Sequence, residues 1–496
     1  MSWRCLPTTC WRSLRSKSQT EAGEGYPWQL GVYRKSYVTP MRRNPGLKGI
    51  TSVQAERNRN LITFYQSEVW QEKAHSIIPG GAHTYAKGDD QYPTLAPGFL
   101  VRGDGCHVWD VDGNEFIEYG MGLRAVTLGH GYRPVVEAAY KQMVQGSNFT
   151  RPATIELDCA QELLDLIDNA DMVKFAKNGS DAVTAAVRLS RAYTGRDIVA
   201  RCADQPFFSV DDWFIGSTPM SAGIPQVVRE LTVQFRYNDI ESLRALFDQY
   251  PSKIACVVME AATTAEPKED FLASVAKMCQ KEGAVFILDE MITGFRWQLG
   301  GAQKYYGVVP DLSAFGKGIA NGFSVSALAG KREIMELGGL RHDKERVFLL
   351  STTHGAENHS LAAAIETMRI FKKEQVIERL HQQGDRLRRG IDEVIESLDL
   401  KGYFEVLGKS SNLIYATRDQ SRQPSQAFRA LFLQETIHRG LLMPSMVVSF
   451  SHSDEDIDRT VEAVGQSLRV YRKALEDGIE KYLIGRPVKP VFRKFN

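Results

Sequence analysis

Two absences in this 496-residue sequence argue against particular classes of binding partner. No apolar run approaches the roughly 20 residues that a membrane-spanning helix requires, so we expect no membrane partner. Neither sign of charge is in excess, because 61 basic side chains oppose 60 acidic ones, for a formal net charge of +1. With no basic stripe interleaved with aromatic residues, the sequence also argues against a nucleic-acid partner.

Cysteine is sparse as well. The seven cysteines are scattered, without Cys-x-x-Cys pairs and without histidines at zinc-ligand spacing. An odd and dispersed set is typical of reduced thiols in a cytosol-like compartment. We therefore expect no metal site and a cytoplasmic protein.

The first forty residues leave a second compartment open. The opening MSWRCLPTTCWRSLRSKSQT contains arginine, lysine and serine but no acid, a composition that mitochondrial transit peptides share. Location in the mitochondrial matrix is thus the alternative. An unstructured tail, or a wrong start ahead of Met41, explains the same composition, and we favour these two interpretations.

The most informative stretch begins with the apolar run Ala284–Leu288, which is typical of a strand covered on both faces in a parallel sheet. Asp289 and Glu290 follow directly, at the expected carboxyl end of this strand, where open α/β sheets place their ligands. Further on, Lys317 stands between Gly316 and Gly318. These features place candidate ligand-binding groups around one strand end.

Lys317 has two interpretations. A lysine among glycines has little local bulk, and an amine that loses hydration can become a nucleophile able to form a Schiff base. For a lone Gly-Lys-Gly, a solvated loop lysine would be the ordinary interpretation. A nucleotide-binding phosphate loop is excluded, because Asp311 occupies the first glycine position and Gly318 replaces the hydroxyl residue.

The complete run, DEMITGF followed by GGAQKYYGVVPDLSAFGKGIANG, resembles the signature of class III aminotransferases, which hold pyridoxal 5'-phosphate (PLP). Within that family it is most similar to the glutamate-1-semialdehyde 2,1-aminomutase-like branch. The resemblance covers roughly residues 60 to 470. It implies the PLP-dependent transferase fold of type I, an α/β fold whose large domain has a mainly parallel seven-stranded sheet, with a smaller α+β domain beside it.

The same resemblance implies a division of the chain into four parts. We expect a disordered amino-terminal extension over residues 1–50 and a segment over 51–120 that joins the small domain. The large PLP-binding domain should cover 121–345. The carboxy-terminal small domain and tail should cover 346–496.

The resemblance also assigns the catalytic roles. Lys317 would form the resting Schiff base with PLP and then, as a free amine, move the proton between the substrate carbon and the cofactor. Asp289 would lie against the pyridine nitrogen and keep it protonated. Glu290 should point to the opposite side of the chain, so we expect no catalytic role for it.

A strand–turn–helix pattern supplies the candidate phosphate contacts. The pattern predicts a strand over Val173–Ala176 and then a helix that is capped by Ser180 or Asp181 and ends at Gly195. A Gly-Ser pair that opens a helix offers free backbone N–H groups and the positive end of the helix dipole to an anion. By resemblance, Gly179 and Ser180 hold the PLP phosphate.

Two further cofactor contacts follow from the resemblance. Phe207 takes the position of an aromatic ring that stacks on the pyridine, although Phe208 stands beside it. Thr353, with Thr352 in reserve, takes the position of a threonine that family dimers send across the subunit interface to the neighbouring phosphate. The resemblance therefore implies a homodimer with its active site at the interface.

Three residues are candidate substrate contacts. Thr84 and Lys87 lie in the loop Ile77–Pro93, whose family counterpart lies at the mouth of the active site. Arg124 follows Leu123, which stands where the aminomutases carry tryptophan, and a guanidinium there suits bidentate capture of a carboxylate. Surface loop residues, and for Arg124 an ion pair at an interface or on the surface, remain the alternatives.

The segment Trp213–Arg229 aligns with the gating loop of the aminomutases but looks shorter and poorer in glycine. A shorter lid would release the keto product and favour ordinary transamination. We therefore expect a PLP-dependent transaminase that moves an amino group between a small-molecule donor and a small carbonyl acceptor, an aldehyde, keto acid or keto sugar. Intramolecular amino transfer of the glutamate-1-semialdehyde aminomutase type is the alternative. A catalytically idle PLP-binding protein is a more remote one.

Overall fold

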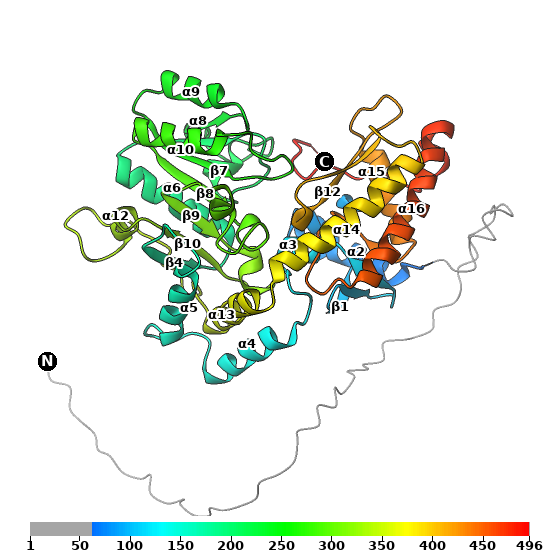
Figure 1. The fold of residues 1–496 in the computed structure, drawn as a ribbon, viewed down its shortest axis with the longest axis horizontal. Coiled ribbons are helices and arrows are strands. Elements are labelled where there is room, and N and C mark those ends of the chain that lie inside the picture. Colours follow the sequence, from blue (N-terminus) through cyan, green and yellow to red (C-terminus); the bar gives the residue numbers. More distant parts are fainter. Residues whose placement is uncertain (1–61, 496) are drawn as a thin grey trace, which may run out of the picture. The chain divides into compact units, whose positions relative to one another are not determined.

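A computed structural model describes residues 62–495, so the predictions for the first fifty residues lie outside the described part of the chain. Within residues 62–495, no helix combines the length and the apolar character needed to cross a membrane. Figure 1 shows the main sheet and its helices, mostly in green, as one lobe, and α14, α15 and α16, in yellow to red, in the other.

A seven-stranded sheet organises the first lobe, as the resemblance predicts. Its strands, in spatial order, are β4 (Met172–Ala176), β10 (Ser326–Gly330), β9 (Leu312–Phe315), β8 (Val285–Glu290), β7 (Ile254–Glu260), β5 (Ile198–Cys202) and β6 (Thr232–Phe235). Strand β10 is antiparallel to both of its neighbours, and the other adjacent pairs are parallel. The mainly parallel sheet is thus confirmed.

Helices cover both faces of this sheet. Val285 and Ile287 of β8 pack in the core beneath α6 (Gly179–Thr194), whereas Phe286 and Leu288 pack beneath α9 (Ile240–Gln249) and α10 (Phe271–Glu282). Successive side chains of a strand point to opposite faces, so a strand buried on both sides must be apolar throughout. This requirement explains the unbroken apolar run that precedes Asp289.

The second sheet joins distant parts of the chain. Its order is β1 (Leu100–Asp104), β2 (His107–Asp110), β3 (Glu115–Glu118) and β13 (Leu441–Leu442), with β13 parallel to β3. This pairing supports the predicted joining of residues 51–120 to the small domain, although the domain limits stay predictions. The antiparallel pair β11 (Phe404–Leu407) and β12 (Ile414–Thr417) lies in the same carboxy-terminal part.

The remaining longer helices are α2 (Tyr65–Ile77), α4 (Arg133–Gln145), α5 (Thr154–Leu164), α13 (Asn358–Lys373), α14 (Val376–Ser397), α15 (Gln426–Ile437) and α16 (Asp454–Asp477). Short helical turns connect the elements around the site: α3 (Met121–Arg124), α7 (Asp212–Ile215), α8 (Gln226–Glu230), η5 (Thr293–Phe295), α11 (Ala302–Tyr306), η6 (Lys317–Ala320) and α12 (Arg332–Met335).

Candidate active site

Three charged residues gather where neighbouring strands of the main sheet end. Glu260 is the last residue of β7 and pairs in register with Asp289 of β8. Asp289 in turn pairs with Ala314 of β9, and Lys317 follows shortly after that strand. Because the carboxyl ends of parallel strands meet at one edge of a sheet, the topology brings the predicted pair Lys317 and Asp289 together and adds Glu260.

Burial and mutual charge shift the protonation of this trio. Burial lowers the pKa of Lys317, while the carboxylates of Asp289 and Glu260 oppose that shift. Burial likewise raises the pKa of Asp289 to about 6, against the opposing effects of Lys317 and of the Met291 backbone N–H, which donates to Asp289 Oδ1 over 2.8 Å. An amine whose charge is destabilised in this way is suited to nucleophilic chemistry.

Glu260 is a member of the site to which the sequence assigned no role. Burial and then the neighbouring Asp289 raise its pKa to about 8, and Lys317 and Arg124 act in the opposite direction. Its backbone is held by Gln205, whose side chain accepts from Glu260 N and donates to Glu260 O, both over 2.7 Å. The signal in the sequence was the acid that ends a buried strand, the same signal that identified Asp289.

Glu290 has a different task. Its carboxylate accepts from the backbone N–H groups of Ala302 and Gln303, over 2.9 and 2.7 Å, and from the Thr293 hydroxyl. The side chain therefore satisfies the free amides at the start of α11. This arrangement is consistent with the prediction that Glu290 has no part in catalysis.

Arg124 lies in an unusual backbone conformation. Four consecutive residues have positive φ: Met121 at 42°, Gly122 at 56°, Leu123 at 58° and Arg124 at 73°. For residues other than glycine, a left-handed helical conformation costs roughly 1–2 kcal/mol each, so this turn needs support from its surroundings. The Arg124 side chain is fixed by its Nε, which donates to Asn412 Oδ1 over 2.8 Å.

Arg296 supplies part of that support. It is 1% exposed, and its guanidinium donates to three backbone carbonyls, those of Ser411 (3.0 Å), Val448 (3.1 Å) and Arg124 (3.4 Å). Burial, with a smaller effect from the Arg124 charge, lowers the pKa of Arg296 to about 9. A buried cation therefore ties the left-handed turn to the carboxy-terminal part of the chain.

Asn321 ties the same segment to the turn that carries Lys317. Its side-chain oxygen accepts from Leu128 N and its amide donates to Gly129 O, both over 2.9 Å. Lys317, the first residue of η6, has a φ of 44°, and Asn321, the residue after η6, has a φ of 45°. Both residues therefore have a left-handed backbone conformation. The Lys317 turn and the segment around Arg124 are thus held as one structure.

The predicted phosphate turn forms the amino terminus of α6, with one correction. The helix is capped by Asn178, whose Oδ1 accepts from Asp181 N over 3.1 Å, and not by Ser180 or Asp181 as expected, because the helix already begins at Gly179. The first-turn N–H groups at Gly179 and Ser180 have no acceptor within the helix, so they are available to an anion. A Cβ on Gly179 would lie 2.8 Å from the Met291 sulfur.

The two phenylalanines of the predicted ring contact differ sharply in exposure. Phe208 is 1% exposed and belongs to the core beneath α6, whereas Phe207 is 44% exposed. Both rings pack edge-on against Phe214, at centroid distances of 5.6 Å for Phe207 and 5.7 Å for Phe208. Only Phe207 of this pair has a ring face to offer, which favours the residue chosen from the sequence.

Thr353 lies on an exposed stretch just before α13. Its carbonyl accepts from Asn148 Nδ2 over 2.9 Å. A few residues on, Glu357 forms an ion pair with Lys177, the first residue of the phosphate turn. Thr353 is solvent-exposed in the single chain, and its contact with a neighbouring subunit stays a prediction.

Thr84 and Lys87 are both exposed, and the structure does not bring them into the charge cluster around Lys317. The Lys87 N–H donates to Thr84 O over 2.8 Å, so the two residues close a single short turn, η3 (Tyr85–Lys87). Their role in substrate binding stays a prediction.

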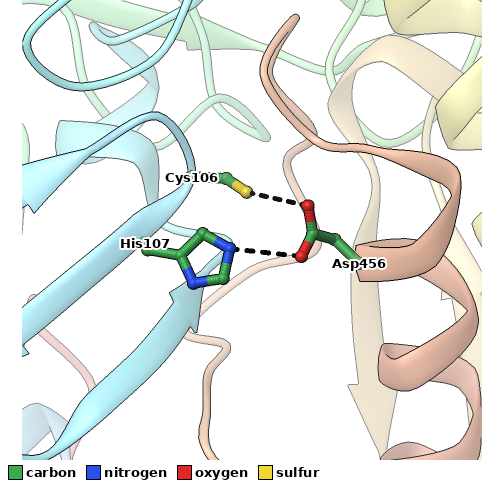
Figure 2. A group of neighbouring side chains, drawn as sticks. All are labelled: Cys106, His107 and Asp456. Carbon is green, nitrogen blue, oxygen red and sulfur yellow. Dashed lines mark hydrogen bonds and ion pairs between the residues drawn. The ribbon is translucent and has the colours of Figure 1, made fainter.

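A second cluster of titratable side chains lies away from this site. Figure 2 shows Cys106 and His107 facing Asp456, the third residue of α16. Their potential ligand atoms all lie within 4.8 Å of one another. However, Asp456 accepts from Cys106 Sγ (3.4 Å), from His107 Nε2 (3.2 Å) and from both the backbone N–H and the hydroxyl of Ser453, so hydrogen bonds account for the whole group.

Comparison with known proteins agrees with this geometry. The family model described as aminotransferase class III matches residues 86–463. The glutamate-1-semialdehyde 2,1-aminomutase of Acetivibrio thermocellus is 32% identical over 427 residues, covering 81% of this chain and 97% of its own length.

Solved structures show the same similarity. The PLP internal aldimine form of the FumI protein of Sphingopyxis sp. MTA144 has a TM-score of 0.75 at 26% identity and covers 83% of this chain and 98% of its own. An omega-transaminase from Sphaerobacter thermophilus has a TM-score of 0.74 at 25% identity, covering 84% and 99%.

Proposed function

This chain belongs to the class III aminotransferase family, and on that premise we propose that Lys317 and Asp289 carry its PLP-dependent amino transfer. The protein is a PLP-dependent enzyme. The observation that carries the assignment of residues is the trio Lys317, Asp289 and Glu260, buried together where β7, β8 and β9 end.

The residues around this trio fit PLP. The free backbone amides at Gly179 and Ser180 suit the phosphate. Gly179 has no Cβ, and a Cβ at that position would be too close to the sulfur of Met291. Phe207 offers an exposed ring face for the pyridine. Asp289 offers a carboxylate for a ring nitrogen, and Lys317 offers an amine for the cofactor carbonyl.

When bound, PLP supplies an electron sink for the substrate carbon that loses its proton. The protein controls where that proton goes. Because burial destabilises the charge on Lys317, its Nζ can take up the proton from the substrate carbon and return it. Asp289 would accept a hydrogen bond from the ring nitrogen of the cofactor. A protonated ring nitrogen there would favour the ionised form of the Asp289 carboxyl group.

Transamination, rather than intramolecular transfer, is supported by the segment Trp213–Arg229. Arg229 donates from Nε to Ile224 O (2.9 Å) and from Nη2 to Ser221 O (2.8 Å), and Arg201 donates to both the hydroxyl and the carbonyl of Ser217. Because the guanidinium groups of Arg201 and Arg229 fix this loop in place, it is poorly suited to open and close over the active site. An open site would release the keto product before it could be re-aminated.

The aminomutase reaction is the second candidate, and one observation favours it. The curated relatives at 30–32% identity carry the name glutamate-1-semialdehyde 2,1-aminomutase. Against it stands Leu123, at the position where the resemblance implies a tryptophan in the aminomutases.

Arg124 is the proposed receptor for a substrate carboxylate. Its side chain is oriented by Asn412, and its charge is felt by both Lys317 and Glu260. Arg124→Ala should raise KM for carboxylate acceptors by about tenfold or more while changing kcat less, because a charged hydrogen bond is lost.

We propose further that the enzyme is a cytoplasmic homodimer in which Thr353 of each subunit reaches the phosphate site of the other. The exposure of Thr353 and the link from Lys177 to Glu357 support this arrangement. The five cysteines of the described part are buried free thiols, in keeping with a reducing compartment. The first forty residues, which carry the mitochondrial alternative, lie outside that part.

Profiling of amino donors and carbonyl acceptors tests the proposed function. A transaminase should form a keto product from the donor and an amine from the acceptor in equal amounts, and Lys317→Ala should form neither. Conversion of a single amino aldehyde without any added donor would instead establish the aminomutase reaction.

A further inference from the structure

The carboxy-terminal tail, residues 479–495, is not used by the proposed function. The family match ends at residue 463, before the tail begins. The tail is nevertheless packed onto the enzyme: Val488 is 3% exposed among Ala430 and Leu433 of α15, and Ile484 N donates to Gln434 Oε1 over 2.8 Å.

From α15 the tail crosses to the loop at residues 79–91, which we call the entrance loop. Arg486 Nη2 donates to Asp89 Oδ2 over 3.1 Å, and Arg493 Nη2 donates to Asp90 Oδ2 over 2.6 Å. Between them, Lys489 N donates to Asp90 O over 2.9 Å. Two ion pairs and a backbone bond thus hold the tail against this loop.

The tail also reaches the aromatic cluster at the active site. The ring of Phe492 lies edge-on to Phe214 at a centroid distance of 6.4 Å, and Phe214 packs against Phe207 at 5.6 Å. The ring of Phe214 thus lies between the tail and Phe207, the residue proposed to face the cofactor ring. Figure 1 shows the end of the described chain, in red, between the two lobes.

A cavity of about 510 Å³ lies between the tail and the entrance loop. Small-molecule sites typically enclose about 300–1,000 Å³. The lining includes three cations of the tail, Arg486, Lys489 and Arg493, and the largely exposed ring of Tyr85. Met220, from the segment Trp213–Arg229, also lines the cavity.

The charges of this cavity favour an anion. Arg486 and Arg493 are paired with Asp89 and Asp90, which leaves the exposed ammonium of Lys489 in excess. In addition, Nη1 of Arg486 is buried and has no hydrogen-bond partner within residues 62–495. Because this nitrogen is buried, a ligand in the cavity would contact Arg486 through another part of its guanidinium, which lines the cavity.

We infer that this cavity binds a phosphate or diphosphate group, carried by the substrate of the Lys317 site, with Lys489 and Arg486 as its contacts. Lys489 supplies an uncompensated positive charge for one anionic oxygen, and the guanidinium of Arg486 can donate to a second oxygen. Tyr85 offers an apolar face to the organic part of an ester. The inference rests on the proposed function for its connection with catalysis, since the same chemistry would admit free phosphate as an effector.

Calorimetric titration of the PLP-loaded enzyme with pyrophosphate tests the inference. Loading with PLP keeps the probe out of the cofactor's own phosphate site. We expect one binding event per chain, weakened about tenfold or more in Lys489→Ala, because a charge-assisted contact is lost. Lys494→Ala is the matched control: it removes one cation from the same tail but not from the cavity lining, and should leave the affinity within about twofold.

A titration with uridine diphosphate distinguishes the two sources of the phosphate group, an organic ester and the free anion. If uridine diphosphate binds more tightly than pyrophosphate, with the same loss in Lys489→Ala, the ligand is an organic ester; equal affinities indicate a free anion. Absence of pyrophosphate binding, or equal weakening in Lys489→Ala and Lys494→Ala, would overturn the inference. The proposed function is judged separately, from the visible absorbance of PLP attached to Lys317, so either can fail alone.

Discussion

Within residues 62–495, the trio at the strand ends and the cluster at the start of α16 differ in how their charges are satisfied. At the strand ends, Lys317, Asp289 and Glu260 shift one another's protonation, and burial moves all three pKa values toward neutrality. At the start of α16, burial tends to raise the pKa of Asp456, but the hydrogen bonds from Ser453 and Cys106 and the charge of His107 together hold it below its usual value.

This difference distinguishes the group proposed to take part in the reaction from the group that stabilises the fold. Groups whose protonation is destabilised by their surroundings are ready to exchange protons with a ligand. Asp456 instead forms a capping box with Ser453 and holds His107 of β2, which fixes a helix to a strand. Substitutions in the first group should therefore affect the reaction, and substitutions in the second should affect stability.

Lys317→Ala should have the largest effect. Loss of the only amine proposed for covalent attachment and proton transfer should lower kcat by about a thousandfold or more. The melting temperature of the cofactor-free protein should not fall, because a poorly solvated charge is removed. Residual activity within tenfold of the parent chain would contradict the assigned role; kcat and thermal melting are the measurements.

Asp289→Asn and Glu290→Gln form a pair of neighbouring substitutions with opposite outcomes. Asp289→Asn should lower kcat by about a hundredfold or more, because the charge near the ring is lost. Glu290→Gln should leave kcat nearly unchanged and destabilise the fold by about 1–3 kcal/mol, because the amides of α11 lose an acceptor. Steady-state kinetics and urea unfolding distinguish the two; the comparison fails if both variants lose activity equally.

Asp456→Ala tests the architectural group. Removal of this carboxylate leaves Ser453 and His107 without their acceptor, so unfolding should become easier by about 1–3 kcal/mol with kcat and KM preserved. Asp458→Ala is the control on the same helix, since Asp458 makes an exposed ion pair with Arg386 and its loss should matter less. A fall in kcat of Asp456→Ala at temperatures where it is folded would show that the α16 cluster also serves the reaction.

Glu260 should make the stability of the cofactor-free chain depend on pH. Glu260 has its pKa raised by burial from an ordinary value of 4.5 to about 8, so the folded, cofactor-free chain holds a proton that the unfolded chain releases. This contribution to stability is complete below about pH 4.5 and is lost as pH rises to about 8. Thermal melting of Glu260→Gln between those limits should be flatter than that of the parent chain; parallel curves would mean that Glu260 does not titrate in this range.

The comparison of the two groups also shows what the sequence could reveal. The apolar run before Asp289 predicted a buried strand that ends in an acid, because strand burial is a local pattern. The seven-stranded sheet and the pairing of Lys317 with Asp289 were implied by the resemblance to class III aminotransferases. Arg296 was not identified. Its role depends on carbonyls of Ser411 and Val448, more than a hundred residues away, and no local pattern encodes such contacts.

The cap of α6 and the tail were missed for related reasons. Asn178 accepts from Asp181 because the helix cap lies two residues before Ser180, a shift that side-chain propensity alone does not decide. The tail contains basic residues that read as a solvated end of the chain. Only the fold places Arg486 and Arg493 opposite Asp89 and Asp90, some four hundred positions earlier in the sequence.

The most direct test of the central assignment is reduction of the PLP-loaded enzyme with borohydride, followed by mass mapping of its peptides. The reduced cofactor should be found on the peptide that contains Lys317, and the visible absorbance should disappear in parallel. Label on another lysine, or none in a protein that still transfers amino groups, would contradict the account.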